Sequence, residues 1–221
     1  MGEIEGARRP RLMKVDTAHD FQWAIERASG YLRSGGLVAY PTESFYGLGA
    51  DATNQEAIER LFLVKKRPPD RPVLILISSI EMLDRCVDSP PPVAHQLMKE
   101  FWPGGLTLVF EAGPMIPSLL TANTGKIGVR LSSHPVATAL TRALGAPVTG
   151  TSANISGEPA CRSGKEVLSA LGEGVDIILD GGKTPGGMGS TILDVTADPP
   201  QILREGMAPV KRLKKYIREA V

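Results

Sequence analysis

The chain has 221 residues, a formal net charge of +1 and a hydrophobic fraction of 42%. This length suits one well-buried α/β domain and is marginal for two. No apolar run approaches the ~20 residues that a membrane-spanning helix needs, and the first residues lack the apolar stretch of a secretory signal, so we expect a cytoplasmic protein. The near-neutral charge also argues against a protein whose whole surface binds nucleic acid.

The cysteines and histidines are few and scattered. Two cysteines, Cys86 and Cys161, and three histidines lie far apart in the sequence. This spacing excludes a disulfide scaffold or a paired-cysteine metal motif, and it disfavours a metal site built from His and Cys. We therefore predict no resident metal site. Magnesium is a separate case, because it can arrive on substrate phosphates and needs few protein ligands.

Taken in chain order, the sequence predicts alternating helices and strands. Apolar residues recur with a helical period over 18–33, and two glycines separate this helix from a short buried strand at 37–40. Asn54 is placed to cap a second helix. The other expected elements are a strand at 73–77, helices at 80–87 and 93–101, strands at 106–111 and 127–131, a helix at 136–144, a strand at 147–150, a helix at 165–171, and strands at 175–179, 191–195 and 201–203. Because helices and strands alternate early and strands cluster late, we predict one α/β domain with a mixed sheet.

Both ends of the chain are expected to lie outside the central domain. We divide the sequence into an N-terminal extension (1–17), a central domain (18–208) and a basic C-terminal helix (209–221). The basic residues of the last segment are Lys211, Arg212, Lys214, Lys215 and Arg218. Such a run fits either the solvated face of a terminal helix or a contact surface for tRNA.

Three familiar motifs nearly occur, but each lacks an essential part. Residues 181–184 (GGKT) end like a phosphate-binding P-loop, but Ile177 stands where the first glycine is required. Residues 47–52 (GLGADA) fit a relaxed dinucleotide-binding pattern, yet a loop separates them from the preceding strand. Residues 150–154 (GTSAN) resemble the nucleophile elbow of serine hydrolases, but Asn replaces the last glycine of that strained turn. Serine hydrolysis is therefore a minor hypothesis.

Two loops at expected strand or helix ends carry unusual polar chemistry. Residues 40–49 (YPTESFYGLG) offer the hydroxyls of Thr42 and Ser44 beside a rigid proline and glycines that permit close backbone approach. Lys65 and Arg67 end the second helix within a proline-rich loop. They fit either a complement to the helix dipole or a polyphosphate site, for which Arg supplies a planar fork and Lys a point charge.

Two further segments complete a candidate anion-binding cavity. Arg130 lies near the end of an otherwise apolar strand, and a buried arginine needs a carboxylate partner. That partner is either an acidic residue of the protein or the carboxylate of a ligand. Residues 149–157 (TGTSANISG) are small and polar throughout. They fit turn and cap chemistry or, beside basic side chains, a cradle for phosphate and nucleotide.

Six segments occur in a specific order: PTESFYGLGADA, KKRP, GGLTLVF, VRLSSHP, TGTSANISG and GSTILDV. Together they resemble the YrdC-like threonylcarbamoyl-adenylate synthases over roughly 32–206, in the short, single-domain form of the family. The resemblance implies a twisted mixed sheet, flanked by helices, around a positively charged cavity. It also implies an enzyme that condenses L-threonine with bicarbonate or CO2 and joins the carbamate to AMP from ATP, releasing pyrophosphate. Mg2+ would accompany the ATP, and a tRNA threonylcarbamoyl transferase complex would use the product.

Matching the family motifs residue by residue gives a set of expected roles. Lys65 and Arg67 match the KxR motif and are the expected catalytic residues. The expected threonine contacts are Thr42, Ser44, Arg130, Ser152 and Ser190. The expected nucleotide contacts are Lys65, Arg67, Arg71, Lys126, Asn154, Arg162 and Arg204.

Two departures from the family pattern concern the expected threonine contacts. Ser44 stands where the family usually has Thr, and Leu76 stands where it often has His. Two alternatives therefore remain open: an RNA-binding protein of the same fold without turnover, and a fold relative with a different nucleotide or small-molecule activity. The joint presence of the KxR motif and the SxN motif favours the synthase over pure RNA binding.

Overall fold

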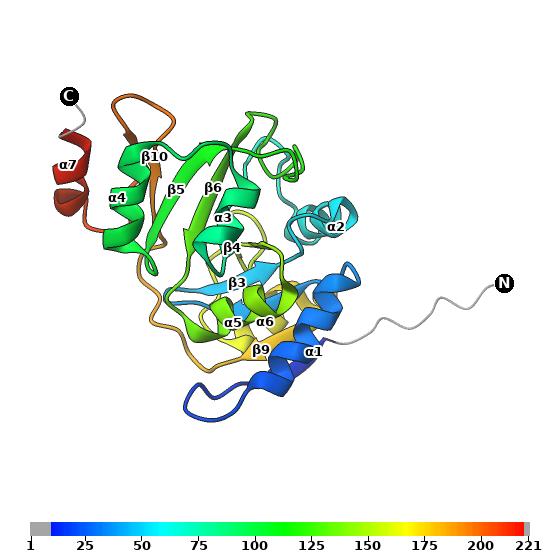
Figure 1. Ribbon diagram of the computed structural model, residues 1–221. Coiled ribbons are helices and arrows are strands. Elements are labelled where there is room, and N and C mark those ends of the chain that lie inside the picture. Colours follow the sequence, from blue (N-terminus) through cyan, green and yellow to red (C-terminus); the bar gives the residue numbers. More distant parts are fainter. Residues whose placement is uncertain (1–9, 219–221) are drawn as a thin grey trace.

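Two mixed β-sheets form the centre of the protein in the computed structural model, which describes residues 10–218 (Figure 1). Within that range the first sheet has the strand order β1-β9-β2-β3-β8, and the second has the order β11-β10-β5-β6-β4-β7. Helices pack around both sheets. The arrangement confirms the predicted single α/β domain with mixed strand directions, with two sheets in place of one.

The first sheet contains β1 (Arg11–Lys14), β2 (Val38–Pro41), β3 (Tyr46–Gly49), β8 (Thr151–Ser152) and β9 (Ile177–Asp180). β1 and β2 both pair in parallel with β9, whereas β3 is antiparallel to β2 and β8. β1 falls within the N-terminal extension expected at 1–17, so this part of the extension belongs to the sheet. Residues 1–9 of the extension lie outside the described residues.

The second sheet contains β4 (Ile75–Ile77), β5 (Leu106–Glu111), β6 (Lys126–Leu131), β7 (Val148–Thr149), β10 (Thr191–Asp194) and β11 (Gln201–Arg204). β10 is parallel to β5 and β4 is parallel to β6, and the other pairs are antiparallel. The two sheets meet at β7, where Thr149 N donates to Ala50 O (3.0 Å) and Thr149 Oγ1 accepts from Ala50 N (2.9 Å). This junction places the ends of β3 and β7 side by side.

The helices are α1 (Gln22–Arg33), α2 (Gln55–Lys65), α3 (Ile80–Cys86), α4 (Pro92–Phe101), α5 (Pro135–Leu144), α6 (Gly164–Leu171) and α7 (Val210–Arg218), with a short 3-10 helix at Gly172–Gly174. α1 begins later than predicted, because Asp16 and Asp20 side chains accept from backbone N–H groups two residues ahead and form turns. Residues 219–221 of the expected C-terminal helix lie outside the described range. No helix within that range is long and apolar enough to cross a membrane.

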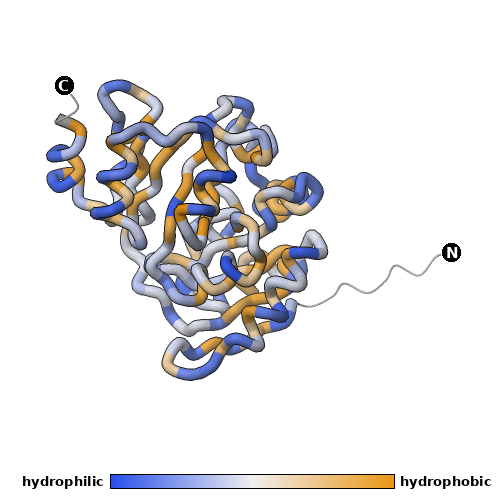
Figure 2. Tube along the Cα trace, in the orientation of Figure 1, coloured by the Kyte–Doolittle hydropathy of each residue, from blue (hydrophilic) through white to orange (hydrophobic). Residues whose placement is uncertain are grey.

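Apolar residues predominate along the strands (Figure 2), and buried apolar side chains cover the inner faces of the helices. α1 and α5 lie side by side and share one core cluster with β2, β4 and β9. The larger cluster joins α2, α3, α4, α6 and α7 to β3, β5, β6 and β10, and it also includes residues of β2, β4 and β9. On α7, Leu213 is buried and Tyr216 packs edge-to-face on Phe101 of α4, with ring centroids 6.0 Å apart.

β2 and β3 form a hairpin that rules out the dinucleotide-binding interpretation of residues 47–52. Gly47 and Gly49 lie within β3, paired with β2, so they form no strand-to-helix turn. A Cβ at Gly47 would lie 2.8 Å from the ring of Tyr40, and glycine is therefore needed for packing at this position. Tyr40 is held in turn by its hydroxyl, which donates to Thr149 O at 2.7 Å.

Candidate functional site

A cavity of about 810 Å³ lies between the two sheets. The first sheet and its loops contribute Thr42, Ser44, Ser152 and the Tyr40 and Tyr46 side chains. The second sheet contributes Thr107, Lys126, Arg130, Ser190, Asp194 and Arg204, and the loop after α2 contributes Arg67. In the described part of the chain, basic side chains outnumber carboxylates along this lining.

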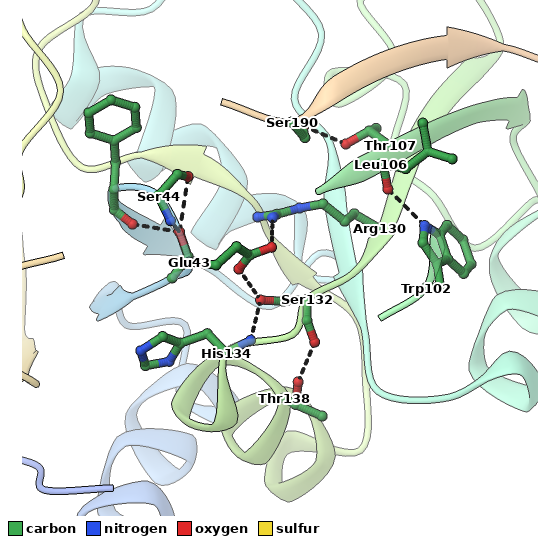
Figure 3. Close-up of polar contacts among 12 residues, drawn as sticks. Glu43, Ser44, Trp102, Leu106, Thr107, Arg130, Ser132, His134, Thr138 and Ser190 are labelled. Carbon is green, nitrogen blue, oxygen red and sulfur yellow. Dashed lines mark hydrogen bonds and ion pairs between the residues drawn. The ribbon is translucent and has the colours of Figure 1, made fainter. Parts of the chain in front are cut away.

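Arg130 of β6 forms an ion pair with Glu43, from the loop between β2 and β3 (Figure 3). Glu43 uses its other oxygen to accept from Ser132 Oγ at 2.6 Å, and Ser132 Oγ accepts from His134 N at 3.1 Å. Arg130 is only 5% exposed, and its Nε has no hydrogen-bond partner among the described residues. The protein therefore supplies one carboxylate to Arg130, and the guanidinium also faces the cavity, where a ligand carboxylate would find remaining donors.

Hydroxyl groups are presented to the cavity by both sheets. Thr42 Oγ1 donates to Phe45 O at 2.7 Å and accepts from Ser44 N at 3.2 Å, which fixes the turn between β2 and β3. Across the cavity, Ser190 Oγ lies 2.7 Å from Thr107 Oγ1 (Figure 3). Thr42 Oγ1 has given its proton to Phe45 O and can only accept from a ligand, whereas of Ser190 and Thr107 the one that accepts their shared hydrogen bond keeps a proton to donate.

Arg204 of β11 reaches the same wall of the cavity as Ser190. Its Nη2 donates to Ser190 O at 2.8 Å, and its Nε donates to the same oxygen at 3.2 Å. Burial, together with the nearby Arg130 cation, lowers the pKa of Arg204 below its usual value. Arg130 and Arg204 line the same cavity, and an anion bound there would offset the repulsion between their charges.

Lys126 and Asp194 form an ion pair at 3.1 Å within the lining. Burial alone would raise the pKa of Asp194, but hydrogen bonds from Thr196 and from Lys126 outweigh it and hold the pKa below its usual value. Asp194 is consequently ionised at neutral pH and already satisfied by protein donors. In residues 10–218 no group of three or more His, Cys, Asp or Glu side chains gathers to hold a metal ion.

Arg67 lies in the lining and is oriented by the loop that follows α2. Its Nε donates to Arg71 O at 3.0 Å and its Nη2 donates to Pro72 O at 2.6 Å. Burial and the neighbouring Arg71 cation lower the pKa of Arg67 from its usual value. The exposed Arg71 contributes its backbone carbonyl to this arrangement, and its own side chain lies outside the lining.

Lys65 is buried behind the cavity instead of lining it. Its Nζ donates to Ser152 O and, at 2.8 Å, to Asn154 O, while Ser156 N donates to Lys65 O at 2.8 Å. Burial and the Arg67 cation lower the pKa of Lys65 to about 8, so the ammonium still carries its charge at pH 7. The KxR and SxN motifs therefore meet, and Lys65 joins them by binding the backbone of the SxN loop.

Three other expected nucleotide contacts lie outside the cavity lining of the described structure. Asn154 donates its side-chain amide to Ile155 O (2.8 Å) and Glu158 O (2.7 Å). Arg162 directs its guanidinium to backbone carbonyls of the β9–β10 connection. Arg71 is the third. The expected residues that do line the cavity are Thr42, Ser44, Arg67, Lys126, Arg130, Ser152, Ser190 and Arg204.

Glu43, Thr107 and Asp194 also belong to this arrangement, although their roles were not predicted from the sequence. Glu43 was identifiable, because a buried arginine requires a carboxylate and this one lies between two selected hydroxyl residues. Thr107 and Asp194 occur within quoted motifs, but their pairings with Ser190 and Lys126 depend on contacts between strands. Leu76, which stands where the family often has His, is buried on β4 outside the cavity lining. It packs in the core cluster of α1 and α5.

The serine-hydrolase hypothesis gains no support from the geometry. Ser152 Oγ has no hydrogen bond to a histidine within residues 10–218. His134, the nearest histidine in sequence, accepts from Val136 N through Nδ1 at 3.3 Å and caps α5. Its pKa is lowered by burial.

Comparisons with known proteins place the chain in a family. A family model for Sua5, YciO and YrdC, described as "Telomere recombination", matches residues 30–206. The threonylcarbamoyl-AMP synthase of Pyrococcus abyssi is 40% identical over 198 residues, which cover 90% of this chain and 58% of that protein. The threonylcarbamoyl-AMP synthase of Vibrio cholerae is 40% identical over 185 residues, which cover 82% of this chain and 97% of that protein.

Solved structures show the same fold. The crystal structure of Pyrococcus abyssi Sua5 complexed with L-threonine superposes with a TM-score of 0.90 at 38% identity, covering 93% of this chain and 60% of that one. The chain therefore spans a little over half the length of the Pyrococcus protein and nearly the whole length of the Vibrio protein.

Proposed function

Because this chain belongs to the Sua5/YciO/YrdC family, we propose that it synthesises threonylcarbamoyl-AMP from L-threonine, bicarbonate or CO2, and ATP. The observation that carries the proposal is the cavity between the sheets. There Arg130, which uses Nη1 for Glu43, lies among the hydroxyls of Thr42, Ser44 and Ser190, in a lining that also holds several basic side chains. The setting we propose is the cytoplasm.

Arg130 is the proposed anchor for the amino-acid substrate. Its buried guanidinium has donors beyond those that Glu43 uses, and a carboxylate is the ligand that fits this fork best. The hydroxyls of Ser44 and Ser190 can then bind polar groups of threonine. This placement would leave the threonine amine free to become a carbamate.

Arg67 is the proposed contact for the ATP phosphates. The carbamate oxygen is itself the nucleophile, so the protein needs to supply positioning and charge stabilisation instead of a covalent intermediate. Arg67 would neutralise charge that develops on the pyrophosphate leaving group. Magnesium would enter with the phosphates as part of the substrate, since Asp194 is already bound by Lys126 and Thr196.

Lys65 has a different proposed role from simple phosphate contact. It fixes the loop that carries Ser152 by binding the carbonyls of Ser152 and Asn154. To reach a phosphate, its ammonium would exchange these acceptors for phosphate oxygens. The product would pass to a tRNA threonylcarbamoyl transferase complex.

The decisive experiment measures pyrophosphate release by the purified chain with MgATP, bicarbonate and threonine, with mass spectrometry of the nucleotide product. We expect release that requires both threonine and bicarbonate, and a product with the mass of threonylcarbamoyl-AMP. Release that ignores either substrate would refute the proposal. Salt-sensitive RNA binding without turnover would favour the RNA-binding alternative, for which the candidate surface is the exposed Lys211, Arg212, Lys214 and Lys215 of α7.

A further inference from the structure

A glycine-rich segment, residues 181–189, connects β9 to β10 beside the cavity. Its beginning is held by Tyr46, whose hydroxyl donates to Gly182 O at 2.7 Å and accepts from Gly181 N at 3.1 Å. At its end, Gly189 lines the cavity next to Ser190. The segment therefore leads from β9 of the first sheet to the part of the cavity wall that Ser190 and β10 form.

The middle of this segment contacts the loop that supplies Ser44. Gly186 N donates to Ser44 O at 2.7 Å. Ser44 is buried, at 6% exposure, and it lines the cavity. A shift of the segment at Gly186 would consequently move the backbone of a residue that faces the ligand.

Arg162 holds the segment at this point. Its Nη2 donates to Pro185 O at 2.7 Å, and its Nε and Nη2 both lie 3.3 Å from Thr184 O. The backbone of Arg162 adds a second attachment, because its carbonyl accepts from Thr184 N at 2.8 Å. The backbone N of Arg162 donates to Glu166 Oε2 at 2.6 Å, which ties this position to α6.

We propose that Arg162 is a positioning residue for the amino-acid side of the cavity, acting through the glycine-rich segment on Ser44. Its planar fork reaches two successive carbonyls at once, which a single ammonium group does less well. The guanidinium donors are thereby used within the protein, and the side chain lies outside the cavity lining of the described residues. This inference rests on the proposed function, and it replaces the nucleotide contact expected from the family match.

Gly186 and Gly187 provide a matched pair for the test. Both have positive φ, +73° and +86°. A Cβ at Gly186 would lie 2.5 Å from Arg162 Nε, whereas a Cβ at Gly187 would meet nothing within 4 Å. Gly186→Ala and Gly187→Ala therefore impose similar backbone strain, but only Gly186→Ala displaces the guanidinium.

The experiment measures the affinities for threonine and for MgATP in separate calorimetric titrations of the full chain. We expect the Kd for threonine to rise roughly tenfold in Arg162→Ala and Gly186→Ala, because a small displacement of a ligand-facing loop is costly. The Kd for ATP should stay near the wild-type value. Arg162→Lys, which keeps one charged donor, should fall between Arg162→Ala and wild type, and Gly187→Ala should resemble wild type.

Two results would overturn the inference. Loss of ATP affinity in Arg162→Ala with threonine affinity kept would identify a nucleotide contact, and unchanged affinities in every variant would remove any positioning role. If circular dichroism shows that Arg162→Ala does not fold, Arg162→Lys and Gly186→Ala still decide between these outcomes. A wild-type chain that binds no threonine would refute the proposed function as well, whereas normal wild-type binding with unresponsive variants refutes this inference alone.

Discussion

Arg130 serves both the fold and the proposed ligand. The sequence left open whether its partner would be a protein carboxylate or a ligand carboxylate. The structure gives Nη1 to Glu43 and leaves Nε without a partner among the described residues, and the guanidinium lines the cavity. Glu43 is itself fixed by Ser132, so the carboxylate holds Arg130 in place. Arg130 can therefore bind a carboxylate of the protein and a carboxylate of the ligand at the same time.

Replacing Glu43 tests how far this ion pair stabilises the fold. Glu43→Gln should lower the free energy of unfolding at pH 7 by about 3 kcal/mol, because it leaves Arg130 buried without a counter-charge. Urea unfolding measures this loss. As the matched control, Glu59→Gln makes the same chemical change on the exposed face of α2 and should change stability by less than about 0.5 kcal/mol. Equal losses in the two variants would show that Arg130 does not depend on the charge of Glu43.

At the scale of elements, the two ends of α2 have different roles: the first turn is capped by Asn54, and the last residue, Lys65, binds the loop that carries Ser152. Asn54 Oδ1 accepts from Ala57 N at 3.1 Å and caps its first turn, as predicted. Its last residue is fixed independently, because Ser156 N donates to Lys65 O at 2.8 Å. We therefore expect the cap to affect stability but not ligand binding.

Removing the cap of α2 tests this separation. Asn54→Ala should lower the free energy of unfolding by about 1 kcal/mol, because one backbone N–H in the first turn loses its acceptor. Asn54→Asp should retain most of the stability, since a carboxylate also accepts this bond and suits the positive end of the helix dipole. Thermal unfolding measures both changes. The affinities for threonine and ATP should remain at the wild-type value in the folded Asn54→Ala protein, and a clear loss of either would contradict the separation.

The elements that the sequence predicted well are those whose apolar pattern is long and clearly bounded. β5 has the predicted bounds, because a run of buried residues, Leu106 to Phe110, follows a pair of glycines and ends at the exposed Glu111. β1, β3 and β8 were not predicted. β3 contains Gly47 and Gly49, which weaken any strand pattern, and β8 has only two residues. β1 is a four-residue edge strand that depends on β9, far along the chain.

Motif matching selected the basic side chains that line the cavity and several of its hydroxyl side chains, but it missed Thr107. It could not show that the donors of Lys65 and Arg162 are used by backbone carbonyls, because those carbonyls belong to loops placed by tertiary packing. It also missed Glu43, whose partner lies on another strand.

At the scale of the whole molecule, the proposed substrates bind in the cavity between the two sheets. Thr42 and Ser44 come from the first sheet, and Arg130 and Ser190 come from the second. A ligand that contacts residues of both sheets can bind only to the folded protein, because only folding brings these residues together. Ligand binding should therefore stabilise the fold as a unit, by mass action on the native state.

Threonine should raise the melting temperature through its carboxylate. At a concentration of a hundred times Kd, the stabilisation is about 2.7 kcal/mol. For a chain of this size, that corresponds to a rise in Tm of roughly 5–10 °C. Threoninamide, which lacks the carboxylate that Arg130 would bind, should give little or no shift at the same concentration. Differential scanning fluorimetry of the free protein with each compound measures the difference. Equal shifts from threonine and threoninamide would mean that Arg130 does not bind the carboxylate of the amino acid, although its guanidinium lines the cavity.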